Sequence, residues 1–215
     1  RALSMPVHIE SLPAALALAE SNFGIARGIR EILVVNCSLG IGAAILMNGS
    51  LARGYGFSAG LIGGITPPGK LEGTLDTLGG GHGILLRLHG NDLNIPEIPA
   101  NRLAEMLLEA LASSKTGDLA ATQAFAEAGR VLGETLTPFL GLLHPESIMI
   151  AGPLAMAPQF VAACRQALGG TLDSLPRGLL VSGLSAQAAA RWVAIDEFLL
   201  QRDLNLDGLK LSKAA

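Results

Sequence analysis

Residues 38–42 (SLGIG) have the residue types and spacing that could hold a phosphate group. Glycine lets the backbone approach a ligand closely, and the N–H groups of a glycine turn can point at phosphate oxygens. Gly40 and Gly42 are therefore candidate residues for binding a nucleotide. A plain hairpin turn has the same residues, so the turn by itself leaves both interpretations open.

A second candidate is the segment 144–153 (HPESIMIAGP), in which an apolar run ends at Gly152. Open α/β sheets bind nucleotides at the carboxyl ends of their strands, where the chain turns toward a helix. Gly152 could stand at such an end. An ordinary turn between a strand and a helix has the same pattern, so Gly152 becomes informative only together with other segments.

The histidines form no catalytic group along the sequence. They are His8, His82, His89 and His144. None belongs to a grouping with serine and aspartate that is typical of nucleophilic catalysis, so surface or capping roles are expected. We expect His82 to lie in a flexible turn, because glycines occupy positions 79–81 and 83.

Composition and cysteine spacing exclude several classes of function. Cys37 and Cys164 lie in apolar stretches and predict two reduced thiols in the core of a cytoplasmic protein. No Cys-x-x-Cys pair exists, so zinc is not expected. The net charge of -3 and the lack of a basic stripe argue against DNA binding by these residues alone. No apolar run reaches about eighteen residues and no signal-peptide pattern opens the chain, so neither membrane insertion nor export is expected.

These candidate residues need a scaffold of strands and helices, and the hydrophobic spacing predicts one. Strands are predicted at 31–37, 41–47, 50–53, 147–151 and 178–182. Helices are predicted at 11–22, 71–88, 100–112, 118–143, 156–168 and 187–203. Ser11 is the expected N-cap of the first helix, Asn48-Gly49 a hairpin turn, and Pro138 a site for a kink. An antiparallel meander, then helices, then a βαβα unit indicates a mixed α/β fold.

Four ordered segments together resemble the ROK family of repressors and sugar kinases. Residues 39–60, with their Gly-x-Gly turn, Asn-Gly hairpin, Arg53-Gly54 and Ala59-Gly60, are similar to the family's signature up to its AGEIGH loop. Residues 144–152 are similar to its NPE-x-IVIGG segment, and residues 6–20 to its PV-x-VENDANAAALAE segment. Residues 70–72 are similar to the end of its GCLE motif, so the resemblance covers residues 6–200.

The resemblance implies a ribonuclease-H-like (actin-like ATPase) lobe built on a mixed sheet. It divides the chain into an interlobe helix at 1–24, a C-terminal lobe at 25–186, and a closing helix and tail at 187–215. In the family, ATP and sugar bind in a cleft between two lobes. ATP is therefore the cofactor that the resemblance allows beside Gly40, Gly42 and Gly152.

The sequence departs from the family pattern at the positions that contact the sugar. Ser11 and Leu12 stand where the family has an Asn that holds the sugar and an Asp that acts as general base. Leucine cannot accept a proton, so the resemblance leaves no catalytic residue. Leu61 and Gly64 replace a Glu and a His, and only Glu72 is retained among these sugar-site positions.

Three functions are compatible with this pattern. The first is a ROK-type transcriptional regulator whose lobe serves dimerisation and effector sensing and lacks sugar-kinase activity. It would be a homo-oligomer that responds to a sugar or phosphosugar and contacts DNA only through another domain. The second is an ATP-dependent kinase for a hexose or amino sugar with a relocated base, and the third is a structural or interaction lobe without a ligand. We expect the first, because the base is lost and Lys70 replaces the last cysteine of the family's zinc loop.

Overall fold

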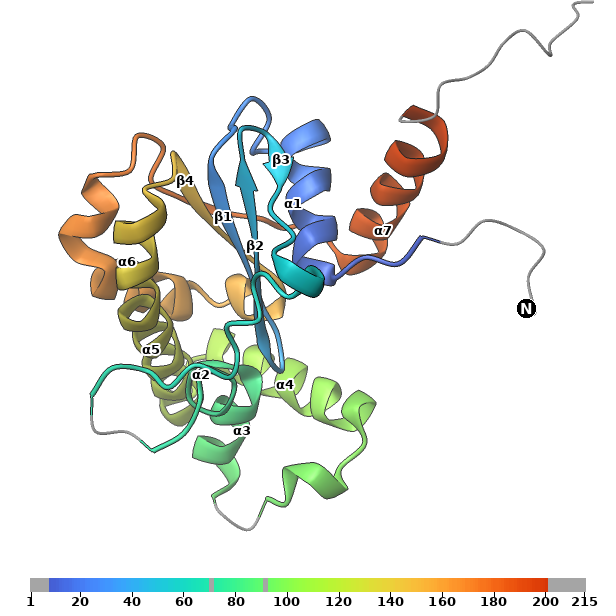
Figure 1. Ribbon diagram of the computed structural model, residues 1–215. Coiled ribbons are helices and arrows are strands. Elements are labelled where there is room, and N and C mark those ends of the chain that lie inside the picture. The colour runs from blue at the N-terminus through green and yellow to red at the C-terminus, as the bar shows by residue number, and fades with distance from the viewer. Residues whose placement is uncertain (1–7, 70–71, 91–92, 201–215) are drawn as a thin grey trace, which may run out of the picture.

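The computed structural model describes residues 8–69, 72–90 and 93–200, which form one five-stranded mixed sheet with helices on both faces (Figure 1). The strands are β1 (Ile32–Cys37), β2 (Ile41–Met47), β3 (Ser50–Leu51), β4 (Ser147–Ala151) and β5 (Leu179–Val181). Their spatial order is β3-β2-β1-β4-β5. The meander β1–β2–β3 is antiparallel, whereas β4 and β5 run parallel to β1.

Seven α-helices are described around this sheet, joined by short 3-10 turns. They are α1 (Leu12–Phe23), α2 (Leu75–Gly79), α3 (Gly81–His89), α4 (Ala100–Lys115), α5 (Leu119–Leu143), α6 (Pro158–Asp173) and α7 (Ala186–Ile195). Figure 1 shows α1 and α7 on one side of the sheet and α5 and α6 on the other. A π-helical turn, Asp196–Leu200, extends α7.

The sheet separates two apolar cores, because neighbouring residues of a strand point to opposite faces. In β1, Leu33 and Val35 pack toward α5 and α6, while Ile32 and Val34 pack toward α1 and α7. All six residues of β1 are buried, as expected for a central strand covered on both faces. The mixed α/β fold with an antiparallel meander is thereby confirmed.

Ser11 is the N-cap of α1, as predicted, and accepts a hydrogen bond from the Ala14 N–H at 3.4 Å. The third strand is shorter than the predicted range 50–53 and ends at Leu51, although the Ala52 N–H still donates to the Ile45 oxygen of β2 at 2.8 Å. Pro138 lies inside α5, which continues to Leu143. The closing helix predicted at 187–203 is α-helical only to Ile195.

The helix predicted at 71–88 is wrong as a single element. It is two helices, because Gly80 has an extended backbone between α2 and α3. A Cβ atom on Gly80 would lie 2.7 Å from the Leu39 oxygen, so the junction packs directly against the turn after β1. His82 is not in a flexible turn: it lies in α3, and its N–H donates to the Leu39 oxygen at 3.1 Å.

Several residues that carried predictions lie outside the described residues. They are Pro6, Val7, Lys70, Leu71 and the segment 201–215, which includes the end of the predicted closing helix. Within the described ranges, no helix combines the length and the apolar character needed to cross a bilayer.

Candidate functional site

The first turn of α1 lies between two cavities. Ser11 is extended and caps the helix, and Pro13 follows inside its first turn. Pro13 packs on β2, where a Cβ atom on Gly42 would lie 3.1 Å from the proline ring. Gly42 therefore lets α1 approach the sheet, and this places Ser11 beside one cavity and Leu12 beside the other.

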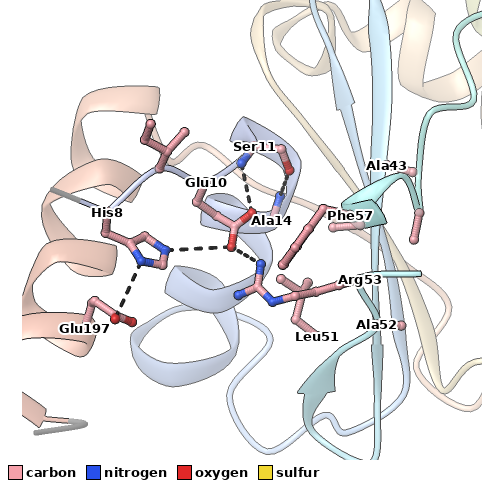
Figure 2. A pocket seen from close by; sticks show the side chains of 13 residues that line it. His8, Glu10, Ser11, Ala14, Ala43, Leu51, Ala52, Arg53, Phe57 and Glu197 are labelled. Carbon is pink, nitrogen blue, oxygen red and sulfur yellow. Dashed lines mark hydrogen bonds and ion pairs between the residues drawn. The ribbon is translucent and has the colours of Figure 1, made fainter. Parts of the chain in front are cut away.

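The first cavity has a volume of about 740 Å³ and lies between α1, the edge of the sheet and the turn beyond α7 (Figure 2). Its lining residues are His8, Ile9, Glu10, Ser11, Ala14, Ala43, Ala44, Leu51, Ala52, Arg53, Phe57, Ala59 and Glu197. The five alanines in this lining leave room above the strands. A volume of this size is typical of small-molecule sites.

A polar network joins three distant parts of the chain on one side of this cavity (Figure 2). The Glu10 carboxylate accepts the Ser11 N–H at 2.9 Å and a hydrogen bond from Arg53 Nη1. His8 Nε2 lies 3.9 Å from the Glu10 carboxylate, and its Nδ1 lies 3.6 Å from that of Glu197. This Glu10 bond is the one hydrogen bond of the Arg53 side chain that the described residues show, and 39% of this side chain, which carries five N–H donors, is exposed.

Phe57 has an unfavourable backbone that its packing does not explain. Its φ is 61°, in the left-handed region, and 76% of the residue is exposed. Left-handed backbone costs a bulky residue about 1–3 kcal/mol, and such strain gathers at binding sites. The ring lines the first cavity, with the Arg53 guanidinium 5.6 Å from its centre.

The second cavity has a volume of about 500 Å³ and lies on the other side of the α1 N-terminus. Its lining residues are Leu12, Leu16, Asn36, Ser38, Leu108, Gly152, Pro153, Met156, Ser182, Gly183, Leu184, Ser185, Ala186 and Gln187. Leu12, which the resemblance places at the family's base position, thus lines the same cavity as Gly152. This lining contains leucine, amide and hydroxyl side chains, but no carboxylate, imidazole or amine.

The other predicted sugar-site positions do not join this group. Leu61 is 77% exposed, and Gly64 and Glu72 are exposed as well. They line neither of the two cavities. The structure therefore brings Ser11 and Leu12 together at one helix end and leaves the remaining three apart from both cavities.

The candidate phosphate glycines have close neighbours within the protein. A Cβ atom on Gly152, whose φ is 91°, would lie 2.6 Å from the Cys37 oxygen and 2.7 Å from Asn36 Oδ1. A Cβ atom on Gly40 would lie 3.1 Å from the carboxylate of Asp76. Sequence reasoning missed Asp76, although an acidic residue just after Thr74 is typical of the first turn of a helix.

The segment 144–152 contains residues that hold the fold together. His144 has left-handed backbone and ends α5. The Glu146 carboxylate accepts the N–H groups of Arg30 at 2.8 Å and Glu31 at 3.2 Å. The hydrogen bond from the Arg30 N–H, with help from that of Glu31 and from Arg177, lowers the pKa of Glu146 below its usual value.

The two cysteines are free and buried, as predicted. Burial raises the pKa of Cys164 to about 12 and that of Cys37 well above its ordinary value, so both are neutral thiols at physiological pH. Within residues 8–69, 72–90 and 93–200, no three His, Cys, Asp or Glu side chains are placed to share a metal ion.

The chain is similar to both regulators and kinases. It is 29% identical over 205 residues to the bifunctional enzyme NanE/NanK of Brucella suis, a match that covers 90% of this chain and 35% of that protein. It is 27% identical over 216 residues to the DNA-binding transcriptional dual regulator NagC of Escherichia coli, covering 92% of this chain and 50% of NagC. The chain thus spans half or less of the length of these two relatives.

Solved structures support the predicted fold class. A ROK family glucokinase from Streptomyces griseus, in complex with glucose and AMPPNP, matches with a TM-score of 0.70 at 19% identity. The match covers 90% of this chain and 68% of the glucokinase chain, which confirms the actin-like ATPase fold. The family model described as ROK family matches residues 1–191, and the chain therefore belongs to the ROK family.

Proposed function

We propose that this chain is the effector-sensing lobe of a ROK-type transcriptional regulator and that it does not phosphorylate a sugar. Similarity to NagC makes a regulator one of the two functions found among its relatives. Similarity to NanE/NanK makes a kinase the other. The proposal also includes DNA contact, formation of a homo-oligomer and a cytoplasmic location. These properties depend on more of the protein than the effector site.

The observation that carries the proposal is the lining of the second cavity. Phosphoryl transfer to a sugar needs a group that accepts the proton of the attacking hydroxyl. Leu12 occupies the family position of that base, and the described lining around it offers no carboxylate, imidazole or amine instead. ATP could enter this space without meeting a base that would activate a sugar hydroxyl.

Of the two carboxylates that line the first cavity, Glu10 and Glu197, Glu10 is the candidate for a relocated base because it lies two residues from Leu12. Its two oxygens are already engaged, one by the Ser11 N–H and the other by Arg53. Taking a proton would weaken both hydrogen bonds, because each favours the ionised carboxylate. This arrangement suits a positioning residue better than a general base, and we therefore rank the kinase second.

The first cavity is the proposed effector site. A sugar could stack on the exposed ring of Phe57 and place hydroxyl groups against Arg53, Glu10 and His8. The other N–H donors of Arg53 would suit a phosphosugar as well. A structural lobe without a ligand would gain nothing from the strained backbone of Phe57. This cavity therefore favours a sensing lobe over a structural one.

The test of the effector site is calorimetric titration of the protein with hexoses, amino sugars and their phosphates, using Phe57→Gly as the diagnostic variant. Glycine accepts a φ of 61° without strain, so we expect the free energy of unfolding to rise by about 0.5–1 kcal/mol. Loss of the ring should weaken effector binding about tenfold. If Phe57 served only the fold, its replacement by glycine would not raise the free energy of unfolding and at the same time weaken effector binding.

Tyr55→Ala is the matched control, because Tyr55 is fully exposed two residues away and does not line the cavity. It should change neither stability nor binding. Sugar binding that survives Phe57→Gly unchanged, or the absence of saturable binding to any sugar or phosphosugar, would contradict the proposed effector site.

A further inference from the structure

The glycine turn after β1 is closed on two sides by the protein itself. The carbonyl oxygens of Ser38 and Leu39 accept the N–H groups of Gly81 at 2.8 Å and His82 at 3.1 Å. On another side, the Ile41 N–H donates to Asp76 Oδ1 at 2.6 Å. An N–H group of the turn that a phosphate could use therefore already has an anionic acceptor.

The Asp76 side chain occupies space that two glycines leave open. A Cβ atom on Gly40 would lie 3.1 Å from its Oδ1, and a Cβ atom on Gly63 would lie 2.4 Å from the same oxygen. The Asp76 N–H donates to the Gly63 oxygen at 2.9 Å, which holds this residue between the turn and the loop that contains Gly63. Both glycines thus accommodate an internal carboxylate.

A phosphate and a carboxylate cannot share this turn favourably. Each needs the same N–H donor, and two anions a few ångströms apart in a partly buried site repel each other strongly. The residues of the turn therefore do not fit the phosphate groups of ATP, although Gly40 and Gly42 match the family's Gly-x-Gly pattern.

We propose that the Asp76 carboxylate is the resident anion of the 38–42 turn and excludes phosphate groups from it. This goes beyond the proposed function, because it assigns a phosphate-excluding role to a residue outside the catalytic and sugar-contacting positions. It also predicts that replacing this single side chain would allow the turn to bind an anion.

The experiment is a titration of isotope-labelled protein with pyrophosphate, followed at the Ile41 backbone amide by NMR. The wild-type protein should show no saturable shift up to millimolar pyrophosphate. Asp76→Ser removes the charge and empties the space beside both glycines, so we expect a saturable shift and binding at least about tenfold tighter. Asp76→Ala serves as the second variant if the serine variant does not fold, since it also removes the charge and the acceptor oxygens from the Ile41 N–H.

Asp118→Ser is the matched control. Asp118 also holds a backbone N–H at the start of a helix, that of Ala121 at 2.7 Å, but it is the N-cap of a different helix, α5. Its loss should leave the wild-type response to pyrophosphate unchanged. Saturable pyrophosphate binding at the Ile41 amide of the wild-type protein would overturn the inference, as would folded Asp76 variants that gain no binding. A wild-type protein that binds pyrophosphate yet transfers no phosphate to a sugar would overturn this inference and leave the proposed function standing.

Discussion

At the scale of single residues, the structure separates positions kept for chemistry from positions kept for packing. Glu146 belongs to a segment that resembles the nucleotide side of the family, yet its carboxylate holds the N–H groups of Arg30 and Glu31. Gly40 and Gly152 likewise have close neighbours within the protein. A family motif can therefore persist because the fold requires it, and its presence does not by itself indicate nucleotide binding.

Glu146 gives a pH-dependent prediction. Its pKa is lower in the folded protein, so its contribution to stability is present above the unfolded-state pKa and is lost as pH falls through the folded-state value. Glu146→Gln should reduce the free energy of unfolding by about 0.5–1 kcal/mol at pH 7, since the side chain is partly exposed and screened.

The measurement is urea unfolding at several values between about pH 7 and pH 3, the range in which glutamate titrates. The difference between wild type and Glu146→Gln should shrink as the pH falls. If the difference in unfolding free energy between the two proteins stayed constant over this range, the charge of the Glu146 carboxylate would not contribute to stability.

At the scale of elements, the sequence predicts best where a long apolar pattern defines a strand or helix. The ranges 31–37, 41–47, 118–143 and 147–151 match observed elements within about one residue, because burial enforces their spacing. The break at Gly80 was missed, since the packing that requires it comes from the distant turn at Leu39. Asp76 was missed for the same reason, because its partner Ile41 is far away in sequence.

The contact between α5 and α6 gives a prediction about glycine. A Cβ atom on Gly129 would lie 2.1 Å from the Phe160 oxygen, and one on Gly133 would lie 2.6 Å from the Cys164 oxygen. Gly129→Ala should therefore force the two helices apart and lower the free energy of unfolding by about 1–3 kcal/mol. This loss would be measured by urea unfolding, in which the slope of the unfolding free energy against urea concentration should stay unchanged.

Gly141→Ala is the control within the same helix. A Cβ atom there would meet nothing within 4 Å, and alanine is the better helix former. We expect the free energy of unfolding to rise by about 0.5–1 kcal/mol. If both substitutions destabilised the protein equally, close packing at Gly129 would not be the cause.

At the scale of the whole molecule, fold class and family were both predictable, and the arrangement of the site was predictable only in part. Sequence placed Ser11 and Leu12 at a helix start, and the structure puts them beside two different cavities. The first cavity combines Glu10, Arg53 and Glu197 from separate parts of the chain. No local pattern connects these residues, so their grouping could come only from the tertiary structure.

The most direct test of the proposed function is an assay for phosphoryl transfer. The protein is incubated with magnesium, ATP and a panel of hexoses and amino sugars, and the release of ADP is followed beside an active ROK glucokinase. Because the proposal puts Leu12 where the family has its base, we predict no sugar-dependent ADP release above that of ATP alone. Sugar-dependent turnover that yields a phosphorylated sugar would contradict the proposal and make the protein a kinase with a relocated base.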